Sequence, residues 1–286
     1  MTTPSNTDTL PQGTHIGRTA LRVDDLDRLT EFYRTVAGLG VLEESETRSV
    51  LGVGDTPLLV LEADADAPTR PRTGAGLYHT AFRVPSREAL GDALARIRTH
   101  WQLGGASDHW VSEALYLTDP EGNGIEIYRD RPRDDWPRNG DGTVRIGTVP
   151  LALESIEAAA TGDTLAPPGT DIGHVHLEVT SLDAFDDFYV DTLGFEVQTT
   201  VPAAAFVSAG GYHHHVGANT WQHRTTPVDG RGLSWFELVV PDQGALDAVR
   251  SRVDDREIPV TETEAGLVVH DPDEIEVRIR TGPSAP

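Results

Sequence analysis

The sequence repeats itself at a fixed spacing, and this duplication limits the folds that the chain can adopt. Positions in the first half recur 156 residues later, and the pair Asp119-Pro120 recurs at Asp271-Pro272, which implies a shorter loop in the second copy. Repeated units bury their apolar surfaces by packing copies of one arrangement together. We therefore expect two related halves. The first matched pairs are Gly17 with Gly173, Leu21 with Leu177, Val23 with Val179, Leu26 with Leu182, Phe32 with Phe188, Tyr33 with Tyr189, Gly38 with Gly194 and Val41 with Val197.

Each half divides again, because Thr19-Ala-Leu-Arg-Val and Thr80-Ala-Phe-Arg-Val match at a spacing of 61 residues. Each quarter has the pattern of a strand, a helix and further strands. In the first quarter the helix is expected over 24–37, capped by Asp24 or Asp25. In the third quarter Gly210-Gly211 indicates a hairpin turn. The sequence thus predicts an α+β fold of four βαβββ modules, with strands at 18–23, 49–53, 58–61, 205–208 and 212–219 and a second helix at 182–192.

One linker joins the two halves of the chain. We expect a flexible tail over residues 1–14, an N-terminal domain over 15–130 and a C-terminal domain over 171–286. Residues 131–170 begin rich in Pro, Arg, Asp and Gly, and this composition favours a surface linker. A weak strand at 144–149 and a short helix at 153–160 are expected within it.

Composition excludes several classes of site and partner. Cysteine is absent, so disulfides, thiolate nucleophiles and cysteine-based metal sites are excluded. The sequence has neither an apolar run of membrane-spanning length nor a signal-peptide pattern, and we expect a cytoplasmic protein. With 23 basic and 46 acidic residues the net charge is −23, and every basic residue is arginine. Such a surface repels phosphate backbones and anionic lipids, so neither nucleic acid nor membrane partners are expected.

The excess of scattered carboxylates is typical of proteins from salt-loving cells and predicts a stability that depends on salt. Mutual repulsion is screened over a Debye length that falls from about 30 Å at 0.01 M to about 3 Å at 1 M salt. We expect the melting temperature to be higher in molar KCl than in dilute buffer. Thermal melts across a KCl series measure this, and a melting temperature independent of salt would contradict it.

Histidines occupy one register position of the repeat in only two of the four modules. The position holds Arg18, His79, His174 and Trp235 in the four successive modules. In the strand that begins at Gly173, alternation also places His176 on the same face as His174. Two imidazoles on one strand face indicate either a metal or catalytic edge or two polar positions facing solvent, and the strand alone does not decide between them.

A second pattern, in the second module, gives the chain a family resemblance. The pattern contains His109, Leu115-Tyr116, Asp119-Pro120, Gly122 and Glu126. With the strand openings of the type Gly-His-Val-x-Leu-x-Val, it resembles the vicinal oxygen chelate superfamily, which includes glyoxalase I, fosfomycin-resistance proteins and extradiol ring-cleaving dioxygenases. The chain is most similar to the two-domain catechol 2,3-dioxygenase branch, although Ser107 departs from that branch's pattern.

This resemblance implies a vicinal oxygen chelate fold, in which the four modules form two paired half-barrels. It also implies roles for individual residues. The metal ligands would be His79, Glu126 and His174. His109 and Tyr116 would hold and polarise the bound substrate. The acid–base histidine would come from the segment Tyr212–Asn219, where strand alternation favours His215, with His213 as the substitute.

The distribution of ligands predicts how the modules pair. At the histidine position, module one carries Arg18 and module four carries Trp235. In module four, Val268 also replaces the tyrosine that module two has as Tyr116. Only modules two and three together supply two histidines and a carboxylate. We therefore expect module two to pair with three and module one with four, which leaves a relic site containing Arg18, Trp235 and Glu276.

The expected function follows from this ligand set. Two histidines and one carboxylate suit non-haem Fe(II), with Mn(II), Zn(II) and Ni(II) as alternatives. The resemblance implies an extradiol dioxygenase that acts on a small aromatic diol and O2; a homo-oligomer is left open. The alternatives are a glyoxalase-like metal-dependent lyase and a non-enzymatic protein that binds a small aromatic or antibiotic.

Overall fold

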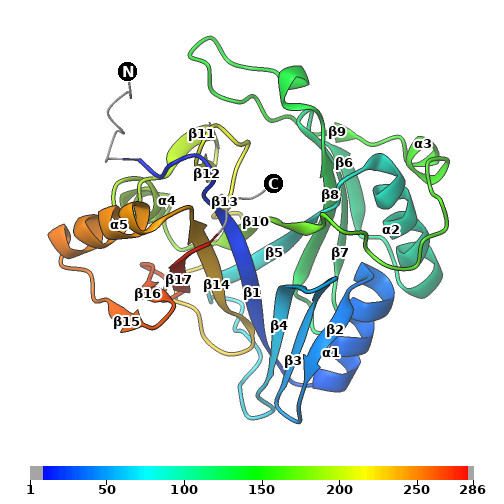
Figure 1. Cartoon of the computed structure of the whole chain (residues 1–286), viewed down its shortest axis with the longest axis horizontal. Helices are drawn as coiled ribbons and strands as arrows, with labels where there is room; N and C mark the ends of the chain where they lie inside the picture. Colours follow the sequence, from blue (N-terminus) through cyan, green and yellow to red (C-terminus); the bar gives the residue numbers. More distant parts are fainter. Residues whose placement is uncertain (1–8, 283–286) are drawn as a thin grey trace.

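The chain forms two curled β-sheets with helices on their outer sides (Figure 1). The structure is a computed structural model and describes residues 9–282. One sheet has eight strands in the order β15-β16-β17-β14-β1-β4-β3-β2. The other has nine strands in the order β11-β12-β13-β10-β5-β8-β7-β6-β9. The predicted α+β class, with four modules in two paired half-barrels, is confirmed.

Each module opens with a strand and a helix and continues with further strands. Module one contains β1 (His15–Val23), α1 (Leu26–Phe32), the π-helical turn η1 (Tyr33–Ala37), β2 (Gly40–Glu44), β3 (Arg48–Val53) and β4 (Thr56–Ala63). Module two contains β5 (Gly76–Arg83), α2 (Arg87–His100), β6 (Gly105–Asp108), β7 (Ser112–Thr118) and β8 (Gly124–Asp130). Module three contains β10 (Asp171–Glu178), α4 (Leu182–Phe185), the π-helical turn η3 (Asp186–Val190), β11 (Glu196–Val201), β12 (Ala204–Ser208) and β13 (Val216–Asn219). Module four contains β14 (Gly232–Val240), α5 (Gln243–Asp255), β15 (Thr261–Thr263), β16 (Gly266–His270) and β17 (Glu276–Thr281).

The modules pair across the two halves of the sequence. Strand β1 lies antiparallel to β14, and β5 lies antiparallel to β10. Module one therefore shares a sheet with module four, and module two shares a sheet with module three. This is the pairing that the distribution of histidines predicts.

The helices begin and end where local chemistry requires. Asp25 caps α1 by accepting the backbone N–H of Arg28 at 3.0 Å, and Ser181 caps α4 in the same way. Both helices continue as π-helical turns, so the expected helices at 24–37 and 182–192 each form in two parts. Gly38 ends the first at φ 79°, a left-handed conformation that glycine adopts without strain. None of the helices within residues 9–282 is both long and apolar enough to cross a membrane.

The expected strand at 212–219 is wrong over its first four residues. Strand β13 begins only at Val216, because Gly210 and Gly211 both have positive φ and the following residues turn irregularly. Side chains hold this irregular segment. The Tyr212 ring packs against Trp136, and its hydroxyl donates to Asp130 Oδ2 at 2.9 Å. Alternation of side chains therefore does not apply to residues 212–215.

The linker packs against the nine-stranded sheet. It contains the 3-10 turn η2 (Arg133–Asp135), the short strand β9 (Val149–Pro150) and α3 (Leu153–Glu157). Strand β9 pairs with β6, and α3 packs against α2. The expected strand at 144–149 forms only at its end, since the buried side chain of Val144 instead joins Trp136 and Tyr212 in a small apolar cluster. Residues 1–8 of the expected tail lie outside the described residues, whereas Leu10 is buried.

The eight-stranded sheet contains the predicted relic position, where a buried tryptophan replaces histidine. Trp235 is 2% exposed, and the guanidinium of Arg278 lies 3.9 Å from its ring centroid. Arg18 also lies over this ring, and Glu276 is the cross-strand neighbour of Trp235. These residues fill the position with apolar and ion-pair contacts.

We expect Trp235→Ala to lower the free energy of unfolding by about 3–5 kcal/mol, the usual cost of deleting a buried Trp, without changing the chemistry in the other sheet. Chemical denaturation and steady-state kinetics of the same preparation measure the two effects. The matched control, for stability alone because Trp221 lines the pocket, is Trp221→Ala, which removes an indole that is 41% exposed and should cost far less stability. Loss of turnover in folded Trp235→Ala protein would contradict this assignment.

Candidate active site

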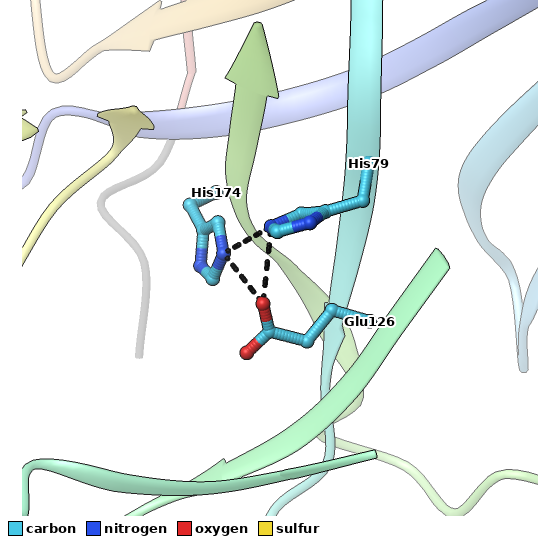
Figure 2. A group of neighbouring side chains, drawn as sticks. All are labelled: His79, Glu126 and His174. Carbon is cyan, nitrogen blue, oxygen red and sulfur yellow. Dashed lines mark hydrogen bonds and ion pairs between the residues drawn. The ribbon is translucent and has the colours of Figure 1, made fainter. Parts of the chain in front are cut away.

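Three neighbouring strands bring two histidines and a glutamate to one point (Figure 2). Ala81 of β5 lies between His174 of β10 and Glu126 of β8 in the sheet register. His79 lies two residues before Ala81 and therefore points to the same face. The small side chain of Ala81 sits between the larger ones. The repeat thus places the three side chains together because modules two and three share one sheet.

The three candidate ligand atoms form a nearly equilateral triangle. His79 Nε2 lies 3.0 Å from Glu126 Oε2, and His174 Nε2 lies 3.2 Å from both of these atoms. Two ligands that each lie about 2.1 Å from a metal at right angles are about 3.0 Å apart, so the triangle has the size of one face of an octahedral metal site.

Hydrogen bonds alone do not satisfy this triangle. If both Nε2 atoms carry protons toward the carboxylate, two N–H groups face each other at 3.2 Å. If either is unprotonated, its lone pair faces the carboxylate oxygen or the other imidazole. A divalent cation would accept all three lone pairs at once. The donor set therefore fits a metal ion better than a proton network.

The protonation states of Glu126 and His174 also suit a cation. All three side chains are buried, with exposed fractions of 5% or less. Burial lowers the pKa of His174 to about 4, so its ring is neutral at neutral pH. Burial by itself would raise the pKa of Glu126, but its contacts with His174 and His79 outweigh it and lower that pKa well below its usual range. Glu126 is therefore ionised.

His109 and Tyr116 form a hydrogen-bonded pair beside this cluster. His109 Nδ1 lies 2.7 Å from the Gly147 carbonyl and must donate to it, so in the neutral ring Nε2 accepts from the Tyr116 hydroxyl at 2.6 Å. Tyr116 is the cross-strand neighbour of Glu126. Burial and the charge of Glu126 raise the pKa of Tyr116 well above its usual range, so its hydroxyl keeps its proton. The linker thus supports His109 through Gly147.

The predicted acid–base residues His215 and His213 do not line the pocket that contains the cluster. His215 faces a different cavity, and its Nδ1 accepts the backbone N–H of Ala209 at 3.1 Å. His213 has an exposed fraction of 0% and is not among the residues that line the pocket. His214 lines the pocket instead, and its ring centroid lies 4.0 Å from that of His174. The side chains differ from the expected placement because residues 212–215 do not form a strand, and the acid–base role itself stays a prediction.

The pocket has a polar base and a largely apolar and aromatic wall. Its volume is about 400 Å³, which is sufficient for a small aromatic molecule. Besides the cluster and the His109–Tyr116 pair, its wall includes residues that sequence reasoning did not assign to a site. These are Tyr78, Ser107, Val111, Ser112, Ile146, Gly147, Thr148, His176, Thr199, Val201, Phe206, His214 and Trp221.

Some of these unassigned pocket residues had a recognisable signal in the sequence, and others did not. His176 shares a strand face with His174, which alternation already indicated; its ring lies 5.0 Å from that of His79. Its Nε2 lies 3.1 Å from Asn219 Nδ2 and outside the triangle. By contrast, Ile146 and Thr148 belong to the linker, where the strand expected at 144–149 does not indicate which surface it would contact.

The comparison with known proteins agrees with this fold. The family description "Glyoxalase/Bleomycin resistance protein/Dioxygenase superfamily" matches residues 15–127 and 171–279. The chain is 42% identical over 270 residues, covering 91% of this chain and 95% of the relative, to a Bacillus subtilis (strain 168) protein named catechol-2,3-dioxygenase.

Solved structures of low sequence identity share the fold. A putative dioxygenase from Bacillus subtilis superposes with a TM-score of 0.65 at 14% identity, covering 96% of this chain and 86% of that one. Glyoxalase I from Zea mays superposes with a TM-score of 0.58 at 15% identity, covering 94% and 92%. The chain belongs to the glyoxalase, bleomycin resistance protein and dioxygenase superfamily. Within that superfamily it is a homologue of catechol-2,3-dioxygenase.

Proposed function

We propose that the protein is an Fe(II)-dependent extradiol dioxygenase that cleaves a catechol beside its two hydroxyl groups. The observation that carries this proposal is the triangle of His79, Glu126 and His174 at the base of an aromatic-walled pocket. These three side chains would hold the metal on one face and leave the opposite face for substrate and oxygen. Bound Fe(II) would supply the electron transfer between diol and dioxygen that ring opening requires. The name of the 42% identical relative supports the same reaction.

The other residues of the pocket bind and orient the substrate. Tyr78, Trp221 and His176 form a connected aromatic group beside His79, against which a planar ring can pack. The Tyr116 hydroxyl donates its hydrogen bond to His109, so its oxygen is free to accept a hydrogen bond from a catechol hydroxyl. His214 supplies the group that takes and returns the substrate proton, because its Nε2 is a buried polar atom with no partner among the described residues.

The reaction itself tests the proposal. The protein is first loaded with Fe(II) under anaerobic conditions. It is then mixed with catechol in oxygenated buffer. Uptake of oxygen together with the yellow absorbance of a hydroxymuconic semialdehyde is expected. If the protein consumes no oxygen but converts a thiol hemiacetal, the lyase alternative is correct. A protein that does neither but binds aromatics tightly is the binding-protein alternative. Glyoxalase-like chemistry normally uses a second carboxylate, and Glu126 is the one carboxylate among the described residues that line the pocket.

The charge of the pocket predicts which catechols react. Among the described residues that line it, none is arginine, so a carboxylate on the ring would be buried without a permanently cationic partner. An unpaired buried charge costs more than about 1–3 kcal/mol, and 1.4 kcal/mol is tenfold. We expect kcat/KM for 3,4-dihydroxybenzoate to lie at least roughly tenfold below that for catechol or 4-methylcatechol.

A cationic side chain added to the pocket should narrow the difference in kcat/KM between neutral and carboxylated catechols. Ile146 lines the pocket from the linker, so Ile146→Arg should raise the relative kcat/KM for 3,4-dihydroxybenzoate. Ile146→Gln is the uncharged control of similar length. Equal kcat/KM values for neutral and carboxylated catechols in the wild type would show that charge does not select the substrate.

A further inference from the structure

The two nitrogen atoms of the His214 ring have very different surroundings. Nε2 is buried and has no partner among residues 9–282, although the ring lines the pocket. Nδ1 lies 2.8 Å from Nδ1 of the neighbouring His213. Side chains of consecutive residues point to opposite faces in a strand, so this contact exists only because the segment after Gly211 is irregular. A neutral His214 ring carries one proton, and its position decides whether Nε2 accepts or donates.

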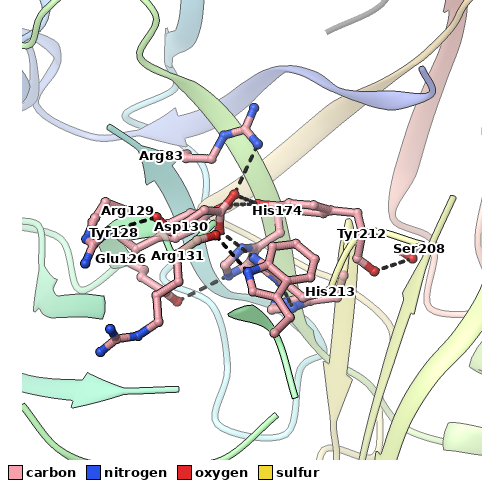
Figure 3. Close-up of polar contacts among 12 residues, drawn as sticks. Arg83, Glu126, Tyr128, Arg129, Asp130, Arg131, His174, Ser208, Tyr212 and His213 are labelled. Carbon is pink, nitrogen blue, oxygen red and sulfur yellow. Dashed lines mark hydrogen bonds and ion pairs between the residues drawn. The ribbon is translucent and has the colours of Figure 1, made fainter. Parts of the chain in front are cut away.

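His213 connects this contact to the carboxylate of Asp130, whose side chain is 20% exposed (Figure 3). Its Nε2 lies 2.9 Å from Asp130 Oδ1. The other oxygen, Asp130 Oδ2, accepts from the Tyr212 hydroxyl at 2.9 Å and lies 3.3 Å from the Arg83 guanidinium. Burial alone would raise the pKa of Asp130, but the contacts with His213, Arg83 and Tyr212 outweigh it and lower that pKa. An ionised carboxylate only accepts, so His213 Nε2 carries a proton.

We propose that Asp130 and His213 are positioning residues that fix His214 in the tautomer with its proton on Nδ1, which presents Nε2 to the substrate as a base. With Nε2 protonated, a neutral His213 has a lone pair on Nδ1, and this lone pair accepts the proton of His214 Nδ1. This inference rests on the proposed function, since it assigns an acceptor atom for the catechol proton. Strand β8 carries both carboxylates, the one of the metal triangle and the one that contacts His213, because Glu126 and Asp130 lie four residues apart on the same face.

The substitution Asp130→Asn tests this assignment without removing a heavy atom from the network. Arg83 has only donors, so it keeps the amide oxygen of the new side chain at the Oδ2 position. The amide NH2 then points at His213 and donates to its Nε2. Both rings then adopt the opposite tautomer, which places the His214 proton on Nε2. That nitrogen can then no longer accept a proton from the substrate. An asparagine in place of a triad aspartate has this effect in serine proteases.

The experiment uses histidine-labelled protein loaded with Zn(II), a diamagnetic ion. Long-range 1H–15N spectra report which ring nitrogen carries the proton, and loss of signals in His214→Gln identifies His214. We expect protonated Nδ1 in the wild type and protonated Nε2 in Asp130→Asn. With Fe(II), kcat of Asp130→Asn should fall roughly 10²–10⁴-fold, with metal content unchanged.

The matched control is Asp171→Asn. Asp171 binds the same Arg83 guanidinium, its Oδ1 accepting from Nε at 2.9 Å, but it does not contact His213 among the described contacts. It should leave the tautomer unchanged and lower kcat far less. Wild-type spectra with the His214 proton on Nε2 would overturn the proposal, as would equal losses of kcat in both variants. Because the spectra do not require turnover, a protein with the expected tautomer but no dioxygenase activity would refute the proposed function alone.

Discussion

Replacement of His79, Glu126 or His174 by alanine is expected to abolish metal retention and ring cleavage together. Each variant leaves two ligands, which define neither the position of the ion nor the open face. Loss of an outer partner of a metal ligand usually costs roughly 10–100-fold in affinity or activity, and loss of a ligand itself should cost more. Metal analysis after gel filtration and oxygen uptake measure both effects.

His176→Ala is the matched control for these three variants. His176 is buried, lies on the same strand as His174 and lines the same pocket, but its Nε2 contacts Asn219. It should retain one equivalent of metal, even if substrate binding weakens. A protein that keeps its metal without His79 or Glu126, or loses it without His176, would show that the triangle is not the metal site.

The sequence determined the pairing of modules because ligand chemistry and the repeat constrain each other. Histidines occur at the shared register position only as His79 and His174, and the preserved carboxylate Glu126 lies in module two. One site with two imidazoles and a carboxylate therefore requires module two beside module three. The antiparallel pairing of β5 with β10 meets that requirement. The role of these residues as ligands stays a prediction.

The sequence did not determine which histidine of residues 213–215 lines the pocket, because periodicity describes only regular elements. The choice of His215 assumed a strand from Tyr212. The backbone instead turns at Gly210 and Gly211, and the segment is held by contacts of Tyr212 with Trp136 and Asp130. Trp136 belongs to the linker, far along the chain from this segment. Contacts of this kind leave no pattern in a single sequence.

His214→Ala is expected to retain metal and substrate affinity while kcat falls roughly 10²–10⁴-fold, the usual contribution of a positioned proton-transfer group. The physical reason is that the His214 ring lines the pocket while its Nε2 has no partner among the described residues. Stopped-flow kinetics with Fe(II)-loaded protein would measure kcat and KM separately. Anaerobic catechol binding would show that the loss lies in the chemistry.

His215→Ala is the decisive comparison, because it removes the same side chain one residue further along. His215 is buried against a second cavity and accepts the backbone N–H of Ala209. Its loss leaves that N–H without its acceptor and should cost about 1–3 kcal/mol of stability, with kcat nearly unchanged. If His215→Ala is instead the slow variant and His214→Ala turns over normally, proton transfer does not pass through His214. The regular strand that alternation predicts at 212–219 would then describe the working enzyme better than the irregular segment does.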